Sequence, residues 1–124
     1  MSHLIRLRVG DLEYEAQLNE SETAQAIYDA LPIECIGSRW GDEYYSRIDV
    51  QMTEADDARS EMAVGELAYW PPGTAFCIFF GPTPASFGDE PRAASPVNPI
   101  GHISEDCSEL NELDHNEPIV IEAM

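Results

Sequence analysis

Three large aromatic side chains and a few arginines are the residues of this sequence best suited to bind a ligand. Trp40, Tyr45 and Trp70 lie close to the ends of predicted strands, where they can frame a groove. Arg39 and Arg92 stand out because the chain has only six basic residues, all of them arginine. In so acidic a protein, a positive group that points into a cleft would favour an anionic ligand. The alternative is that both arginines form structural ion pairs with neighbouring carboxylates.

The patterns of the common catalytic and metal sites are missing from the sequence. Cys35, Cys77 and Cys107 are far apart, whereas a zinc site needs paired cysteines or histidines at close spacing. We therefore predict reduced, structural cysteines, no metal and no cofactor. A metal site formed by His102, Glu105, Asp106 and Cys107 is the alternative to solvated surface residues at these positions.

An excess of acidic residues dominates the composition. The chain has 24 Asp and Glu residues, six Arg, no Lys and a formal net charge of −18. Such a charge weakens a compact domain in dilute buffer, but at about 1 M salt the Debye length falls to about 3 Å and the repulsion is screened. The composition therefore predicts a protein of a high-salt cytoplasm, such as that of a halophilic archaeon. An acidic face for a basic partner is the alternative, although the charge is spread along the chain.

The sequence also limits the possible partners of the protein and the cell compartments in which we expect it. Nucleic-acid binding is disfavoured, because affinity for phosphates depends on clustered lysine and arginine. No apolar run is long enough to cross a bilayer, and the first ten residues resemble a strand rather than a signal peptide. We predict a single soluble, cytoplasmic domain over residues 1–124, with a peptide or small molecule as its partner.

The alternation of apolar and polar residues predicts strands over much of the chain. Residues 5–9 and 12–18 form a β-hairpin around a Gly-Asp turn. Asn19 is then the predicted N-cap of a short amphipathic helix that Pro32 ends.

Four more strands follow the helix in this pattern. They are predicted at 33–40, 43–52, 67–70 and 75–80, and the last two are joined by a rigid Pro-Pro-Gly turn. The stretch at 53–61 is predicted as an acidic surface connection with one helical turn at most.

The segment 81–99 is rich in proline, which lacks the N–H group that a central strand needs. We predict a long loop here that crosses the end of a barrel and forms one wall of any site. Thr83, Arg92 and Asn98 lie in this loop and are candidate ligand-binding residues.

The last part of the chain completes a mainly β pattern. A brief strand is predicted at 100–103, a helical turn within 104–114 and a closing strand at 117–123. The predicted fold is a small closed β-barrel with one amphipathic helix and short helical turns.

Four sequence blocks resemble a known family. The blocks are SRWGDE at 38–43, GELAYWPPG at 65–73, FFGPTP at 79–84 and SPVNPIG at 95–101. Together they resemble the small prokaryotic cyclophilin-like family, which implies a closed β-barrel capped by helix. Isomerases of the cyclophilin fold carry an arginine followed at fixed spacing by phenylalanine and glutamine. Here Met52 stands five positions after Arg47, so that motif is not matched, and fold alone does not imply function.

The resemblance raises prolyl isomerisation as the alternative to ligand binding at the barrel mouth. The barrier of ~18–20 kcal/mol comes from amide resonance, and a hydrogen-bond donor in a dry pocket lowers it. An apolar pocket that holds the proline ring would be lined by Tyr69, Phe76, Phe79 and Phe80. Arg39 or Arg47 would be the donor. The alternative is that the aromatic side chains fill the core and the arginines pair with carboxylates.

The acidic composition generates a prediction about salt. We expect the midpoint of thermal unfolding to rise by several degrees between dilute buffer and molar KCl, because salt screens the repulsion among the carboxylates. Thermal unfolding followed by circular dichroism at both salt concentrations measures this. Equal midpoints would remove the high-salt interpretation.

Overall fold

The computed structural model describes residues 2–124 and is mainly β. In chain order, the elements are β1 (His3–Val9), β2 (Leu12–Leu18), α1 (Glu22–Asp29), β3 (Ile33–Arg39), β4 (Glu43–Arg47), β5 (Arg59–Glu61), β6 (Glu66–Trp70), the 3-10 turn η1 (Pro71–Gly73), β7 (Ala75–Phe79), β8 (Arg92–Ile103), the 3-10 turn η2 (Ser108–Glu112) and β9 (Asn116–Ala123). The predicted mainly β fold with one helix and short helical turns is confirmed.

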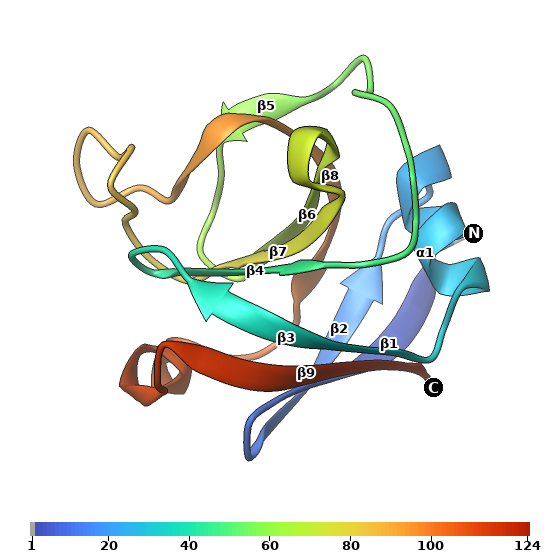
Figure 1. Cartoon of the computed structure of the whole chain (residues 1–124), viewed down its shortest axis with the longest axis horizontal. Helices are drawn as coiled ribbons and strands as arrows, with labels where there is room; N and C mark the ends of the chain where they lie inside the picture. Colours follow the sequence, from blue (N-terminus) through green and yellow to red (C-terminus); the bar gives the residue numbers. More distant parts are fainter. Residues whose placement is uncertain (1) are drawn as a thin grey trace.

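The strand pairings close the sheet on itself. The strands follow the order β2-β1-β9-β3-β4-β7-β6-β8-β5, and β8 also pairs with β2. Every strand except β5 therefore belongs to a ring, which is less regular than the closed barrel that the sequence predicted (Figure 1). At the closure, β2 and β8 approach so closely that a Cβ atom on Gly101 would lie 2.1 Å from the carbonyl oxygen of Gln17. Glycine is therefore required there.

Two hydrophobic clusters lie on opposite faces of β6 and β7. All five residues of β7 are buried, and they alternate between the clusters as strand geometry requires. Phe76 and Ile78 belong to the main core, whereas Cys77 and Phe79 belong to a second, smaller cluster. The second cluster is covered by the first half of β8 and by Met62, which follows β5. Figure 1 shows β5 and the start of β8 set apart from β1, β2 and β9.

The helix begins later than predicted. Its N-cap is Ser21, whose Oγ accepts a hydrogen bond from the Ala24 N–H at 3.1 Å. Asn19, the predicted cap, instead donates from its side-chain amide to the Pro99 carbonyl oxygen at 3.0 Å, and so ties the chain to β8. Ala24 and Ile27 pack into the main core. Within residues 2–124, no helix has the length and apolar character needed to cross a membrane.

The predicted strand at 43–52 is too long. β4 ends at Arg47, although the alternation of buried and exposed residues continues through Ile48 and Val50. The pairing between β4 and β7 ends where Arg47 lies opposite Ala75. Residues after Arg47 therefore have no strand partner, and the strand ends there.

The predicted loop over 81–99 is wrong in its second half, because β8 starts at Arg92 and contains two prolines. Pro99 lies where the pairing with β6 shifts its register, between Leu67 and Ala68. Pro96 lies where the pairing with β5 is interrupted. At an interrupted ladder a missing N–H leaves no broken hydrogen bond, so proline is tolerated.

The acidic stretch at 53–61, predicted as a connection, contains the three-residue strand β5. Its residues, Arg-Ser-Glu, show no alternation of apolar and polar side chains, so no local pattern indicates a strand. The pairing with β8 forms it.

Candidate functional site

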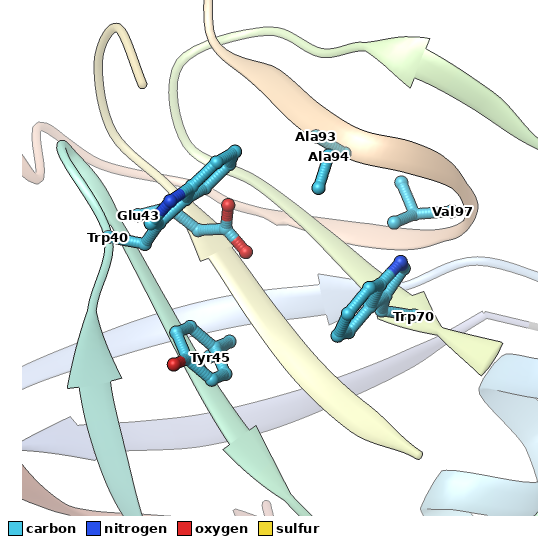
Figure 2. Close-up of a pocket in the computed structure, with 7 residues that line it drawn as sticks. All are labelled: Trp40, Glu43, Tyr45, Trp70, Ala93, Ala94 and Val97. Atoms are coloured by element: carbon cyan, nitrogen blue, oxygen red, sulfur yellow. The ribbon is translucent and has the colours of Figure 1, made fainter. Parts of the chain in front are cut away.

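Seven side chains line a pocket on the face of the sheet that carries the second cluster. The pocket has a volume of about 230 Å³ and is lined mainly by apolar surface (Figure 2). Its lining residues are Trp40, Glu43, Tyr45, Trp70, Ala93, Ala94 and Val97.

Three segments that are distant in sequence bring these residues together. Trp40 comes from the turn between β3 and β4, and Glu43 and Tyr45 come from β4. Residues two apart on a strand point to the same face, which places Glu43 and Tyr45 side by side. Trp70 ends β6, and the alanines and the valine come from the first half of β8. In Figure 2 the Glu43 carboxyl group extends into the space between Trp40, Trp70 and the β8 side chains.

Trp70 is held in place from two sides. Its Nε1–H donates a hydrogen bond to the Ser95 Oγ at 2.7 Å. Its six-membered ring lies against Gly73, where a Cβ atom would approach the ring carbon Cε3 to 2.5 Å. Only glycine leaves room for the indole, so the Pro-Pro-Gly turn that joins β6 to β7 also positions one wall of the pocket.

Glu43 is the unusual group of the pocket. Only 5% of its surface is exposed, and among the described residues its Oε1 has no hydrogen-bond partner. Burial raises the pKa of Glu43 to about 8, and a hydrogen bond with the Cys77 thiol opposes part of this rise. Burial and the neighbouring Glu43 in turn raise the pKa of Cys77 well above its usual value. Near neutral pH the pocket therefore holds a carboxyl group that is mostly protonated and can donate or accept one hydrogen bond.

Two of the predicted site residues, Trp40 and Tyr45, line the pocket together with Trp70, the third aromatic residue of the predicted groove. The groove does not open into the main core. It lies on the opposite face of β6 and β7, beside the second cluster. Tyr45 is 38% exposed, so its ring is open to solvent at the pocket edge.

None of the predicted arginines lines the pocket, although Arg39 and Arg92 each adjoin a lining residue in the sequence. Arg39 donates to the carbonyl oxygens of Gly41, Asn111 and Leu113 and forms an ion pair with Asp42 at 2.9 Å. It therefore joins the β3–β4 turn to η2 instead of facing a ligand.

The other two arginines have surface positions. Arg92 forms ion pairs with Glu61 and Glu90, both at 3.1 Å, and lies over the Phe87 ring. Arg47 is exposed at the end of β4 and borders a different, more polar cavity near Pro32. The arrangement offers no arginine to an anionic ligand in the aromatic pocket.

The remaining predicted residues have structural contacts. Tyr69 is buried in the main core and donates from its hydroxyl to the Val50 carbonyl oxygen at 2.7 Å. Phe79 is buried in the second cluster. Thr83 donates to the Arg92 carbonyl oxygen and so fixes the loop before β8.

Asn98 ties three segments together. Its side-chain amide donates to Thr23 Oγ1 at 3.0 Å and to the Thr53 carbonyl oxygen at 2.9 Å, while its Oδ1 accepts from the Ala55 N–H at 2.8 Å. These contacts engage both the nitrogen and the oxygen of the amide, and the residue is 1% exposed. The side chain stabilises the approach of the 53–55 segment to α1 and β8.

Sequence reasoning missed Glu43 as a site residue. The chain has 24 Asp and Glu residues, so one more acid beside a turn carries no signal by its type. The pattern that could have found it is its spacing: Glu43 stands two residues before Tyr45, on the strand face that Tyr45 shares. Among residues 2–124, no group of three or more His, Cys, Asp or Glu side chains could hold a metal ion.

The fold is a ring of strands with one helix, and an aromatic pocket lies on one face of the sheet. The sequence model of the family described as cyclophilin-like matches residues 3–122, so the chain belongs to that family. The solution structure of a hypothetical protein from Archaeoglobus fulgidus is similar, with 37% sequence identity and a TM-score of 0.83. The match covers 99% of this chain and 95% of that one. No protein with a curated description matches the chain.

The raised pKa of Glu43 generates a prediction about stability and pH. The folded state keeps the Glu43 proton up to about pH 8, whereas the unfolded state releases it near the usual value of 4.5. Between these values the folded state binds one more proton, so the free energy of unfolding falls as pH rises, by at most about 1.4 kcal/mol per pH unit. Glu43→Gln removes this dependence. Urea unfolding of both proteins from pH 5 to 9 in molar KCl measures it.

The matched control is Glu54→Gln, which removes the same charge at an exposed position outside the pocket. We expect the stability difference between wild type and Glu43→Gln to change with pH and the difference for Glu54→Gln to stay nearly constant. Two parallel curves for wild type and Glu43→Gln would contradict the prediction.

Proposed function

We propose that this protein binds a small ligand, or one side chain of a peptide, in the pocket between Trp40, Tyr45 and Trp70. The observation that carries the proposal is the convergence of three large aromatic side chains around a buried carboxyl group with an unpartnered oxygen. Ligand sites are typically apolar clefts that hold a few convergent polar groups.

The unpartnered oxygen argues for a ligand rather than for a purely structural cluster. A buried polar atom without a hydrogen bond costs free energy, about 1–3 kcal/mol in mutational data. Most such atoms in native proteins are satisfied. Among residues 2–124, the Tyr14 hydroxyl is the other buried side-chain atom without a partner, but it does not line this pocket. The buried side chain of Asn98, in contrast, makes three hydrogen bonds. A ligand with a suitable group would satisfy Glu43 in the same way.

The size of the pocket limits what it accepts. A volume of about 230 Å³ is smaller than the ~300–1,000 Å³ usual for drug-sized ligands. A small molecule, a headgroup or a single side chain fills it. The aromatic walls supply most of the contact area, and Tyr45 at the edge stays in reach of a longer ligand.

We expect a variant that fills the pocket to lose ligand binding without losing the fold. Ala94 is exposed and lines the pocket, so Ala94→Phe places a ring in the cavity at little cost in stability. A screen of small molecules by thermal shift in molar KCl, followed by calorimetry of the hits, measures binding. Hits should bind wild type and lose at least tenfold in affinity for Ala94→Phe.

Ala123→Phe is the matched control, because it adds the same ring at an exposed position on β9 that does not line the pocket. It should bind the hits like wild type. Equal affinity of all three proteins for every hit would place binding elsewhere and overturn the proposal.

Prolyl isomerisation is the second candidate function. The aromatic walls suit a proline ring, and the reaction needs a donor toward the prolyl nitrogen. Among the described residues that line the pocket, the Trp40 indole N–H, the Tyr45 hydroxyl and the protonated Glu43 carboxyl can donate, and none is an arginine. We take the Glu43 carboxyl as the donor because it extends into the space between the pocket walls (Figure 2). Membership of the cyclophilin-like family adds support by analogy alone.

If the protein is an isomerase that uses Glu43 as the donor, the rate of catalysed prolyl isomerisation should fall as pH rises through about 8, because Glu43 then loses its proton. Glu43→Gln keeps an N–H donor and should retain most of the acceleration, whereas Glu43→Leu should lose it. A protease-coupled assay on a proline peptide in molar KCl measures the rate. A rate equal to the uncatalysed one would end this hypothesis.

A further inference from the structure

We propose that the aromatic pocket takes an organic cation, a methylated ammonium group, with the Glu43 carboxylate as its counter-charge. The inference rests on the proposed ligand-binding role of the pocket and adds the chemical class of the ligand. It also reverses the sequence-based expectation of an anionic ligand, because the group that points into the pocket is an acid.

The walls of the pocket have the composition that recognises such cations. Trp40, Tyr45 and Trp70 surround the space from different sides (Figure 2). The face of an aromatic ring carries a partial negative charge and attracts a cation within about 6 Å, most strongly for tryptophan. Aromatic cages of this kind are the usual site for quaternary ammonium groups.

Among residues 2–124, no cationic side chain lines the pocket with Glu43. The sequence contains no lysine, and none of the pocket-lining residues is an arginine. Three arginines on nearby segments are already in ion pairs: Arg39 with Asp42, Arg59 with Glu66, and Arg92 with Glu61 and Glu90. A ligand that brings its own positive charge would therefore complete the site.

The remaining contacts select an organic cation over other ligands. A metal ion requires several oxygen ligands, whereas this pocket supplies a single carboxylate among apolar side chains. Methyl groups on nitrogen instead match the apolar surfaces of Ala93, Ala94 and Val97. An ammonium that retains one N–H can also donate it to the unpartnered Oε1 of Glu43.

Binding of a cation should depend on pH through Glu43. The titratable groups beside it are the Cys77 thiol from β7 and the Tyr45 hydroxyl from its own strand, and β8 contributes only apolar residues to the pocket. Without ligand, Glu43 holds its proton up to about pH 8. A bound cation favours the ionised carboxylate, so binding releases a proton below that pH, and affinity rises with pH until it levels off above 8.

Choline and 3,3-dimethylbutan-1-ol make a direct test, because they share a shape and differ in charge. We expect calorimetry at pH 8.5 in molar KCl to give choline at least about a tenfold higher affinity than the neutral alcohol. Glu43→Gln should reduce this preference to what the aromatic rings alone supply, and Glu54→Gln should keep it in full. At pH 6, wild-type titrations in buffers of different ionisation enthalpy should report release of a proton.

The outcomes separate the two proposals. If choline and the neutral alcohol bind the pocket equally well, the cation inference is overturned and the ligand-binding proposal stands. If neither these probes nor any member of the screen binds, both proposals fail. Should Glu43→Gln not fold, the pH dependence and proton release of wild type decide, and choline affinity that is constant from pH 6 to 8.5 would overturn the inference.

Two further arms identify the source of the ammonium group. A peptide with trimethyllysine is compared with the same peptide carrying unmodified lysine, and both are compared with free choline. Tighter binding of the trimethylated peptide than of choline supports recognition of a modified side chain. Tighter binding of choline supports a free small molecule.

Discussion

Burial of β7 on both of its faces is the constraint on which the rest of this structure depends. Its five residues are apolar and have no exposed side, so one face needs the main core and the other needs a second cover. The ring of strands and α1 provide the core. The first half of β8 and Met62, which follows β5, provide the cover. The pocket lies beside this second cluster, where the cover is incomplete and Trp40, Tyr45 and Trp70 remain partly open. The pocket therefore results from the way other segments cover the second face of β7.

Local patterns predicted the elements that depend on near neighbours. The β1–β2 hairpin, the helix and the β6–β7 hairpin follow from alternation, helical periodicity and turn residues within a few positions. β8 could not be predicted in this way. Whether Pro96 and Pro99 fit in a strand depends on which N–H groups the partner strands require, and those partners lie far away in sequence. The early end of β4 also depends on a distant strand, because its pairing with β7 ends where Arg47 lies opposite Ala75.

The candidate site was predictable in its aromatic part and not in its charged part. Tryptophan and tyrosine are rare enough here that their positions near strand ends carry information. Carboxylates are so common that Glu43 does not stand out until burial distinguishes it. Arginine is also rare in this chain, which is why Arg39 and Arg92 were predicted as site residues. In an acidic chain, however, each arginine has carboxylates nearby, and both form ion pairs with them. The high-salt cytoplasm predicted from the composition stays a prediction.

The anchoring of Trp70 between Ser95 and Gly73 has a practical consequence for spectroscopy. The chain contains two tryptophans, and both line the same pocket. Light absorbed at the red edge of the protein spectrum is therefore absorbed by the pocket walls alone. The hydrogen bond to Ser95 fixes the orientation of the Trp70 ring within the pocket wall. The intrinsic emission of this protein reports polarity and quenching at a single place, without any label.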